Sequence, residues 1–364
     1  RSERRPPGLS AIGRQMRHFA TEAFRSFLCT RGAFGGLLFA LLPAGAVSLG
    51  LALQSNLAVE VGMSDDDIAW LSLWSQVIAA LCMVLGGQLS DRYGRRRTLF
   101  VYIALMSLPV LYLMGALIEH QWIMPVGTSG GVRRVAPAAL VTAVWVATLT
   151  YAVAQGLMYG TRSAAMMDVT NPVVAATQFT AYMALMNLAI AYSATWQGIA
   201  AEAIGYPKTL LIDALIGLLC LALIPMLRPD ARGFVDGRGS GRARALAAVL
   251  AIGCLAWVPY RAGLWNPGTA APIVETLFTL IFIASAVFLA AGAAVLAQGN
   301  PMLARAGLGV APLLLATYAR RWFPDPAWVY DTIAVVSAVV LAAQAMQDWP
   351  SLGEEAGSAQ AASA

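Results

Sequence analysis

The stretch from residue 87 to residue 99 reads Gly-Gln-Leu-Ser-Asp-Arg-Tyr-Gly-Arg-Arg-Arg-Thr-Leu. It joins two apolar runs, at about 68–88 and 98–118, and it holds four arginines where the runs hold none. Each run has about 20 residues, the length that a helix rising about 1.5 Å per residue needs to cross a hydrocarbon layer of roughly 30 Å. A short basic loop between two such runs is typical of a helical hairpin that crosses a membrane twice.

The composition of the whole chain agrees with this interpretation. Of its 364 residues, 59% are hydrophobic and 12% are charged, whereas an ordinary soluble domain has roughly 45–50% apolar and about 25% charged residues. So few charged side chains cannot cover the surface of a water-soluble protein of this size. The composition therefore excludes a soluble globular protein and indicates that lipid surrounds most of the chain.

Further apolar runs lie on both sides of this hairpin, and most have the length of a membrane span. Four of them complete a first group of six, at about 33–54, 137–159, 175–200 and 208–227. A second group of four follows, at about 245–260, 272–297, 302–319 and 328–347. We therefore expect an all-α polytopic membrane protein, with a six-helix bundle followed by about four additional transmembrane helices.

Polar segments divide the chain into five expected parts. These are a basic arm at 1–31, the six-helix bundle at 32–228, a Gly- and Arg-rich loop at 229–244, the second helical group at 245–348 and a disordered tail at 349–364. The arm is amphipathic and basic, as in a segment at a membrane surface or a linker between domains. Since it starts without methionine, we expect it to be the remnant of a central loop that followed a missing N-terminal half.

The distribution of positive charge predicts the orientation of the spans. With the basic arm in the cytoplasm, 18 of the 24 lysine and arginine residues lie on the cytoplasmic side, with Arg162 counted in a loop there. Asp65, Asp66 and Asp67 then lie on the far side. Positive residues concentrate in cytoplasmic loops, so this orientation is preferred over its reverse.

Several classes of function lack their usual sequence signals. The four cysteines have no CxxC spacing, there are two histidines, and no HExxH or GxSxG motif occurs. The arginines belong to membrane loops, so they do not indicate nucleic-acid binding. We therefore expect no catalytic residues, no metal, no cofactor and no nucleic-acid partner. The expected partners are the lipid bilayer and a small-molecule solute.

The loop at 87–99 resembles the signature between two helices of the major facilitator superfamily. The resemblance implies a conformational latch made of Gly87, Asp91, Arg92, Gly94, Arg95 and Arg96. Gly87 would let helices approach closely, Asp91 would pair with Arg95, and Gly94 would permit the turn. The alternative is an ordinary positive-inside loop, which explains the arginines but not the order of glycine, aspartate and arginine.

A second segment, beginning at Gly160 and including Ala176-Thr177-Gln178-Phe179, resembles the C-terminal half of the peptide and acetyl-coenzyme A transporter group. Bacterial members of that group include AmpG-like muropeptide permeases. The resemblance covers roughly 35–228 and implies location in the bacterial cytoplasmic (inner) membrane. It also implies that the solute is a muropeptide, a peptide or a molecule like an acyl-coenzyme A.

Polar residues on the second, fourth and fifth spans predict a solute pathway. On a helical wheel at about 100° per residue, polar groups share one face of the fourth span and one face of the fifth. The pathway residues are Gln76, Thr148, Tyr151, Gln155, Gln178, Tyr182 and Trp196. Asn187 falls on the opposite face, where we expect it to bond to another helix. The alternative is that these are interfacial anchors and residues that bond helices together.

Charged residues inside the spans are few. Asp213 is expected near the outer end of the sixth span, where it can reach water, so no proton carrier is predicted. The most consistent function is secondary active transport of a polar solute by alternating access. The alternative is a membrane scaffold or membrane-embedded enzyme derived from a transporter.

Overall fold

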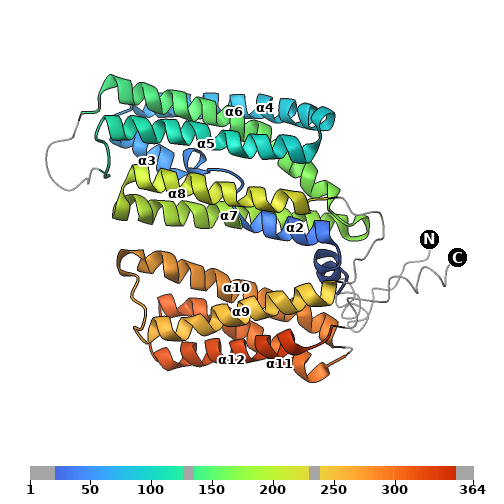
Figure 1. Ribbon diagram of the computed structural model, residues 1–364. Coiled ribbons are helices and arrows are strands. Elements are labelled where there is room, and N and C mark those ends of the chain that lie inside the picture. The colour runs from blue at the N-terminus through green and yellow to red at the C-terminus, as the bar shows by residue number, and fades with distance from the viewer. Residues whose placement is uncertain (1–20, 126–134, 229–237, 298, 350–364) are drawn as a thin grey trace, which may run out of the picture. The chain divides into compact units, whose positions relative to one another are not determined.

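The computed structural model describes residues 21–125, 135–228, 238–297 and 299–349. Within these residues all regular elements are helical, and eight helices are long and apolar enough to cross a membrane. The chain is therefore an all-α polytopic membrane protein, as its composition predicted (Figure 1). Most of the basic arm, the tail beyond Trp349 and much of the Gly- and Arg-rich loop lie outside the described residues.

The chain divides into two compact units. We call residues 35–170 and 179–229 the six-span unit, and residues 1–34, 171–178 and 230–364 the four-span unit. The segment boundaries fall inside two helices, α2 (Arg31–Leu41) and α7 (Ala175–Ile204). Each unit has its own arrangement of helices.

The first span of the six-span unit is broken, where the sequence predicted one helix over 33–54. It consists of α2, the short 3₁₀ helix η1 (Ser48–Gly50) and α3 (Ala52–Glu60). Pro43 cannot donate a helical backbone hydrogen bond, and Gly45 has a φ of 86°, a conformation that favours glycine. The backbone N–H of Gly45 instead donates to the carbonyl of Gly217, at 3.1 Å.

Three long helices follow the broken span. They are α4 (Asp65–Tyr93), α5 (Arg95–Glu119) and α6 (Ala138–Asp168). A capping box between Ser64 and Asp67 starts α4, which turns into α5 at Gly94. With 31 residues, α6 runs nine residues beyond the predicted span, so Arg162 lies within a helix and not in a loop.

The unit is completed by α7, α8 (Tyr206–Leu219) and η3 (Cys220–Met226), while η2 (Pro172–Val174) precedes α7. In Figure 1, α5 lies beside α6 and α8, and these pairs are in contact. Although α7 has 30 residues, it is not among the eight apolar spans. Its polar side chains distinguish it from a helix that only faces lipid.

Glycines set the distance between α4 and α6. A Cβ added at Gly86 would lie 2.4 Å from the carbonyl oxygen of Leu157, and one at Gly160 would lie 2.4 Å from that of Met83. Such contacts are possible only without a side chain, as in other membrane helix pairs packed through small residues. The close approach expected at Gly87 is wrong, because a Cβ there meets no atom within 4 Å. The helical register places its neighbour Gly86 at the contact.

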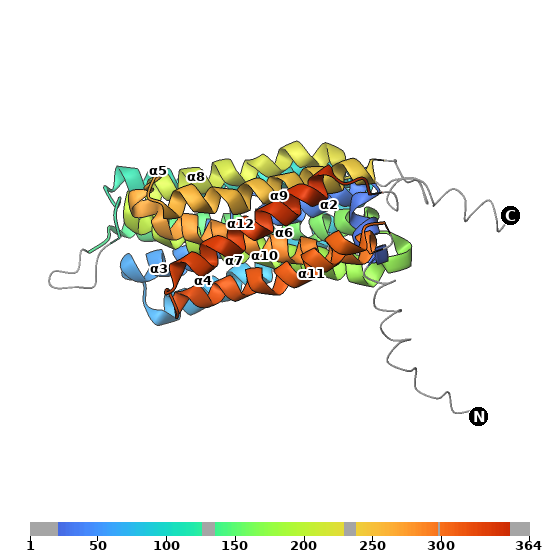
Figure 2. The same cartoon turned by 90° about the horizontal axis from the view of Figure 1, so that it is seen from below.

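The four-span unit contains α9 (Gly239–Arg261), η4 (Gly268–Ala270), α10 (Ala271–Leu296), α11 (Pro301–Ala316), η5 (Thr317–Arg321) and α12 (Ala327–Met346). Among its long helices, α9 packs on α10 and α12, and α11 packs on the same two helices. In Figure 2, α12 runs between α9 and α11. Because α9 begins at Gly239, the end of the predicted loop at 229–244 is helical.

Two residues from the predicted arm and tail belong to the core of the four-span unit. Residues 21–28 are helical, and Phe24 stacks on Trp349 with ring centroids 5.7 Å apart. Phe288 of α10 packs against both rings. Trp349 is 1% exposed, so the apolar core extends to a residue that was expected in a disordered tail.

Candidate functional site

The break in the first span places a backbone donor against a buried carboxylate. Asp213 of α8 is fully buried, and its Oδ2 accepts a hydrogen bond from the backbone N–H of Ser48, at 3.0 Å. Its Oδ1 accepts a second bond from the side-chain amide of Gln197 on α7, at 2.7 Å. The expectation that Asp213 reaches water at a helix end is wrong, because it lies in the middle of α8.

Two residues of the predicted pathway on α6 face the same break. The Gln155 amide donates to the Tyr151 hydroxyl at 3.4 Å, and Tyr151 is 1% exposed. Both side chains lie against Gly50, where an added Cβ would be 2.7 Å from the Gln155 nitrogen. Non-helical backbone at membrane depth is tolerated where protein or an aqueous cavity surrounds it. Here buried polar side chains surround it.

We define the buried polar cluster by seven residues: Ser48, Tyr151, Gln155, Gln197 and Asp213 at the break, with Thr148 and Ser193 one helical turn before Tyr151 on α6 and Gln197 on α7. Among the described residues, three of its polar atoms are buried without a hydrogen-bond partner, namely Thr148 Oγ1, Ser193 Oγ and Gln197 Oε1. Each such atom costs about 1–3 kcal/mol relative to a paired one. An excess of unpaired groups in one place is expected where water or a polar ligand binds.

The other predicted pathway residues lie elsewhere. The Gln178 amide donates to the carbonyl of Ser26 and accepts from the backbone N–H of Asn171, so it joins backbone segments of the four-span unit. Tyr182 is buried against Gly36. Trp196 is half-buried and Gln76 is exposed on α4. Asn187, expected to bond to another helix, is also exposed. The face predicted on α6 therefore coincides with the buried polar cluster, whereas the face predicted on α7 does not.

Three charged side chains connect the ends of α4, α5 and α6. The Arg95 guanidinium donates to Asp91 at 3.1 Å, which is the expected pair, and it also donates to Asp168 at the end of α6. Its Nη1 lies 3.4 Å from the carbonyl oxygen of Ala164. Gly94 has a φ of 91°, as the turn requires. Arg92 and Arg96 are exposed, and sequence analysis did not assign Asp168 to the latch.

The pair between Arg95 and Asp168 should be detectable as a coupling energy. We expect the variants Arg95→Gln and Asp168→Asn to be non-additive by about 0.5–1 kcal/mol, because both side chains are 35% exposed and solvent screens the pair. Denaturant unfolding of both single variants and the double variant in detergent measures this. Arg96→Gln is the control in place of Arg95→Gln. Because Arg96 is exposed, its effect on the free energy of unfolding should add to that of Asp168→Asn. Additivity for both arginines would contradict the ion pair.

A polar cavity lies at one end of the four-span unit. It encloses about 280 Å³ and is lined by residues that include Arg261, Glu275, Arg320 and Tyr330. The indole N–H of Trp257 donates to Asp331 at 2.9 Å. The Arg320 guanidinium lies 4.2 Å from the Trp257 ring centroid. Arg261 lies 3.8 Å from Asp331. Each arginine therefore has an anionic or aromatic neighbour, which accounts for the positive charges around this cavity.

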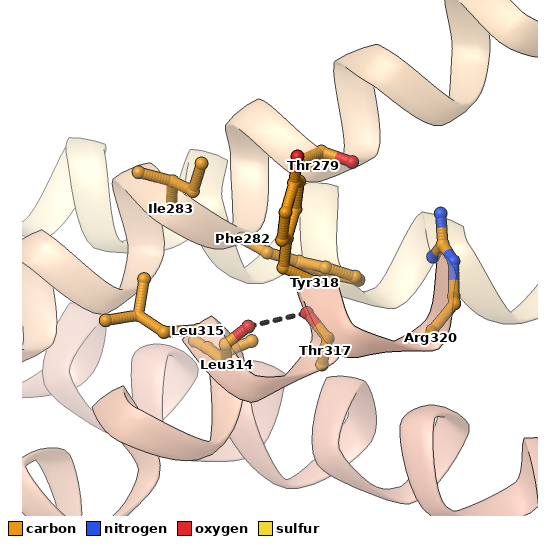
Figure 3. Close-up of a pocket in the computed structure, with 8 residues that line it drawn as sticks. All are labelled: Thr279, Phe282, Ile283, Leu314, Leu315, Thr317, Tyr318 and Arg320. Atoms are coloured by element: carbon orange, nitrogen blue, oxygen red, sulfur yellow. Dashed lines mark hydrogen bonds between the residues drawn. The ribbon is translucent and has the colours of Figure 1, made fainter. Parts of the chain in front are cut away.

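A second pocket in the same unit is too small for a solute. Figure 3 shows it between α10 and the end of α11, with Ile283 and Leu315 at one end and Arg320 at the other. Its volume of about 20 Å³ accommodates a single water molecule. The Thr317 hydroxyl beside it donates to the carbonyl of Leu314, so the main polar group there already has a partner.

The described residues contain no group of three or more histidine, cysteine, aspartate or glutamate side chains placed to hold a metal ion. Comparison with family models, with curated proteins and with solved structures gives no significant match. The candidate functional site consists of the buried polar cluster and the charged residues at the ends of α4, α5 and α6.

Proposed function

We propose that the chain is a secondary active transporter whose six-span unit handles a polar solute by alternating access. The observation that carries the proposal is the buried polar cluster, where unpaired hydroxyl and amide groups meet a broken span and a buried carboxylate. Discontinuous helices are the usual means by which transporters present backbone groups to a solute near the middle of the membrane.

The charged residues at the helix ends support the same proposal. Arg95 connects Asp91 with Asp168, so three helix ends move together while these pairs persist. Partly exposed ion pairs are weak enough to break and form again between two conformations. We assign this set the role of the latch that the resemblance to the major facilitator superfamily implies. A fixed scaffold would not need such a reversible connection.

The remaining assignments rest on the sequence resemblance. We propose the bacterial inner membrane as the location, with the end that carries Arg95 and Asp168 in the cytoplasm. A muropeptide, a peptide or a molecule like an acyl-coenzyme A remains the proposed solute. The proposed partners are the small-molecule solute and the lipid bilayer.

Alternating access can be tested without knowing the solute. Thr148→Cys, in a chain whose four native cysteines are replaced by alanine, should react with a membrane-impermeant thiol reagent from both sides of the membrane. Thr148 is buried in the cluster, so its thiol reaches water only when helices separate. Right-side-out and inside-out vesicles, each labelled from the outside, measure the two accessibilities.

Ala147→Cys is the matched control. Ala147 is fully buried, adjacent in sequence and about 100° away around α6, so its thiol should not react from either side. Reaction of the Thr148→Cys thiol from one side only, or from neither, would overturn alternating access. Equal reaction of both thiols would show general opening of the bundle.

A further inference from the structure

Arg162 is a buried cation that the latch does not use. It lies on α6, six residues or about 9 Å before the end of the helix at Asp168, and it is 3% exposed. Eleven residues separate it from Tyr151, which places the two side chains about 20° apart on one face of the helix. Arg162 therefore extends the face of α6 that carries the buried polar cluster.

The surroundings of Arg162 do not neutralise its charge. The guanidinium lies 5.8 Å from the ring centroid of Phe39, and the groups within electrostatic range are Tyr159, Tyr192 and Cys220. The Tyr192 hydroxyl donates its proton to the carbonyl of Leu41. Among the described residues Arg162 forms no ion pair, and its Nε and Nη2 atoms are buried without a hydrogen-bond partner.

The two unpaired nitrogens form a recognisable binding edge. Nε and Nη2 lie along the same edge of the planar guanidinium group and direct two nearly parallel N–H bonds outward. This is the arrangement that binds two oxygens of one carboxylate or phosphate. A buried cation without an anionic partner is strongly unfavourable, so a protein that keeps one gains when an anion binds there.

We propose that Arg162 binds the anionic group, a carboxylate or a phosphate, of the solute that the six-span unit transports. This inference rests on the proposed function and narrows its solute class to anions. The Arg162 side chain is enclosed in this conformation, so the anion enters when the helices separate. Phe39 and the two tyrosines would then exclude water from the pair, which strengthens it.

Thermal unfolding of the purified full chain in a nonionic detergent tests the proposal, with sodium phosphate and sodium acetate as probes and sodium chloride at matched ionic strength as reference. We expect at least one probe to raise the unfolding temperature of the unchanged chain. In Arg162→Met that anion-specific increase in unfolding temperature should be lost. The apparent affinity for the anion should be at least about tenfold weaker than that of the unchanged chain. Arg162→Lys should bind more weakly than arginine because lysine has no two-donor edge.

Arg97→Met is the control, since Arg97 is exposed, lies outside the predicted latch and should leave the anion response unchanged. Methionine at 162 removes a desolvated charge at similar volume, so the unfolding temperature without anion should stay equal or rise. A lower unfolding temperature together with an unchanged anion response would show a structural arginine. Absence of any response to both probes in the unchanged chain would also overturn the proposal.

A lipid phosphate group has the same chemistry as a soluble phosphate ion. A second experiment distinguishes binding of a lipid from binding of a soluble anion. Nanodiscs of phosphatidylcholine, with and without phosphatidylglycerol, provide the comparison. Stabilisation by phosphatidylglycerol that requires Arg162, without response to soluble anions, would assign the site to lipid and overturn the solute proposal. An Arg162-dependent response to soluble anions would stand even if Thr148→Cys failed to react from both sides, in which case alternating access alone would fail.

Discussion

Replacing Gly156 with valine is expected to prevent accumulation of folded protein. A Cβ at Gly156 would lie 2.3 Å from the carbonyl oxygen of Ala79 and 2.9 Å from its Cα, both on the α4 backbone. Backbone atoms cannot rotate away as a flexible side chain can, so α4 must move off α6. We expect a loss of about 3 kcal/mol or more, against a total stability of about 5–15 kcal/mol for a typical domain.

Gly87→Val is the matched control for this packing. It introduces the same side chain on α4, where an added Cβ meets no atom within 4 Å. We expect near-normal yield, measured by size-exclusion chromatography of fluorescent fusions solubilised from membranes. Gly86→Ala should behave like the Gly156 variant, because its Cβ would lie 2.4 Å from the carbonyl oxygen of Leu157. Similar losses for Gly87→Val and Gly156→Val would contradict the helix contact.

The sequence predicted the membrane spans well because they depend on a property averaged over many residues. The runs expected at 68–88 and 98–118 correspond to α4 and α5, whose ends lie within about five residues of the prediction. A single substitution changes such an average little. The contacts of a polar group within a span depend instead on the exact position of one residue, so no average over the span predicts them.

The residues whose positions were predicted wrongly are those whose positions depend on local geometry. Pro43 and Gly45 interrupt the first span inside an apolar run, so hydropathy did not reveal the break. Arg162 lies beyond the apolar run at 137–159, so the prediction counted it in a loop, although the α6 wheel places it on the polar face. Gln178 shares a face with Tyr182 on an ideal wheel, yet its amide bonds to the backbone of Ser26 and Asn171. The bond to Ser26 joins residues 152 positions apart in the sequence, which an ideal wheel of one helix does not include.

Asp213→Ala is expected to give the largest loss of stability in the buried polar cluster. The change leaves the Ser48 N–H and the Gln197 amide without their acceptor in a buried site. We expect a loss of about 3–5 kcal/mol in the free energy of unfolding, as when one partner of a buried charged interaction is removed. Denaturant unfolding in detergent measures it, with Glu202→Ala, an exposed carboxylate on α7, as the control.

Asp213→Asn separates the role of the hydrogen bonds from that of the charge. An asparagine Oδ1 can still accept from the Ser48 N–H. If the Gln197 amide turns over, its Oε1, which has no partner in the present structure, can accept from the new Nδ2. The expected loss is therefore below about 1.5 kcal/mol. If Asp213→Asn matches Asp213→Ala in stability, the negative charge itself holds the broken span. If Asp213→Ala is as stable as Glu202→Ala, the carboxylate does not hold η1, α7 and α8 together. The buried polar cluster would then lack the hydrogen bonds that connect its residues.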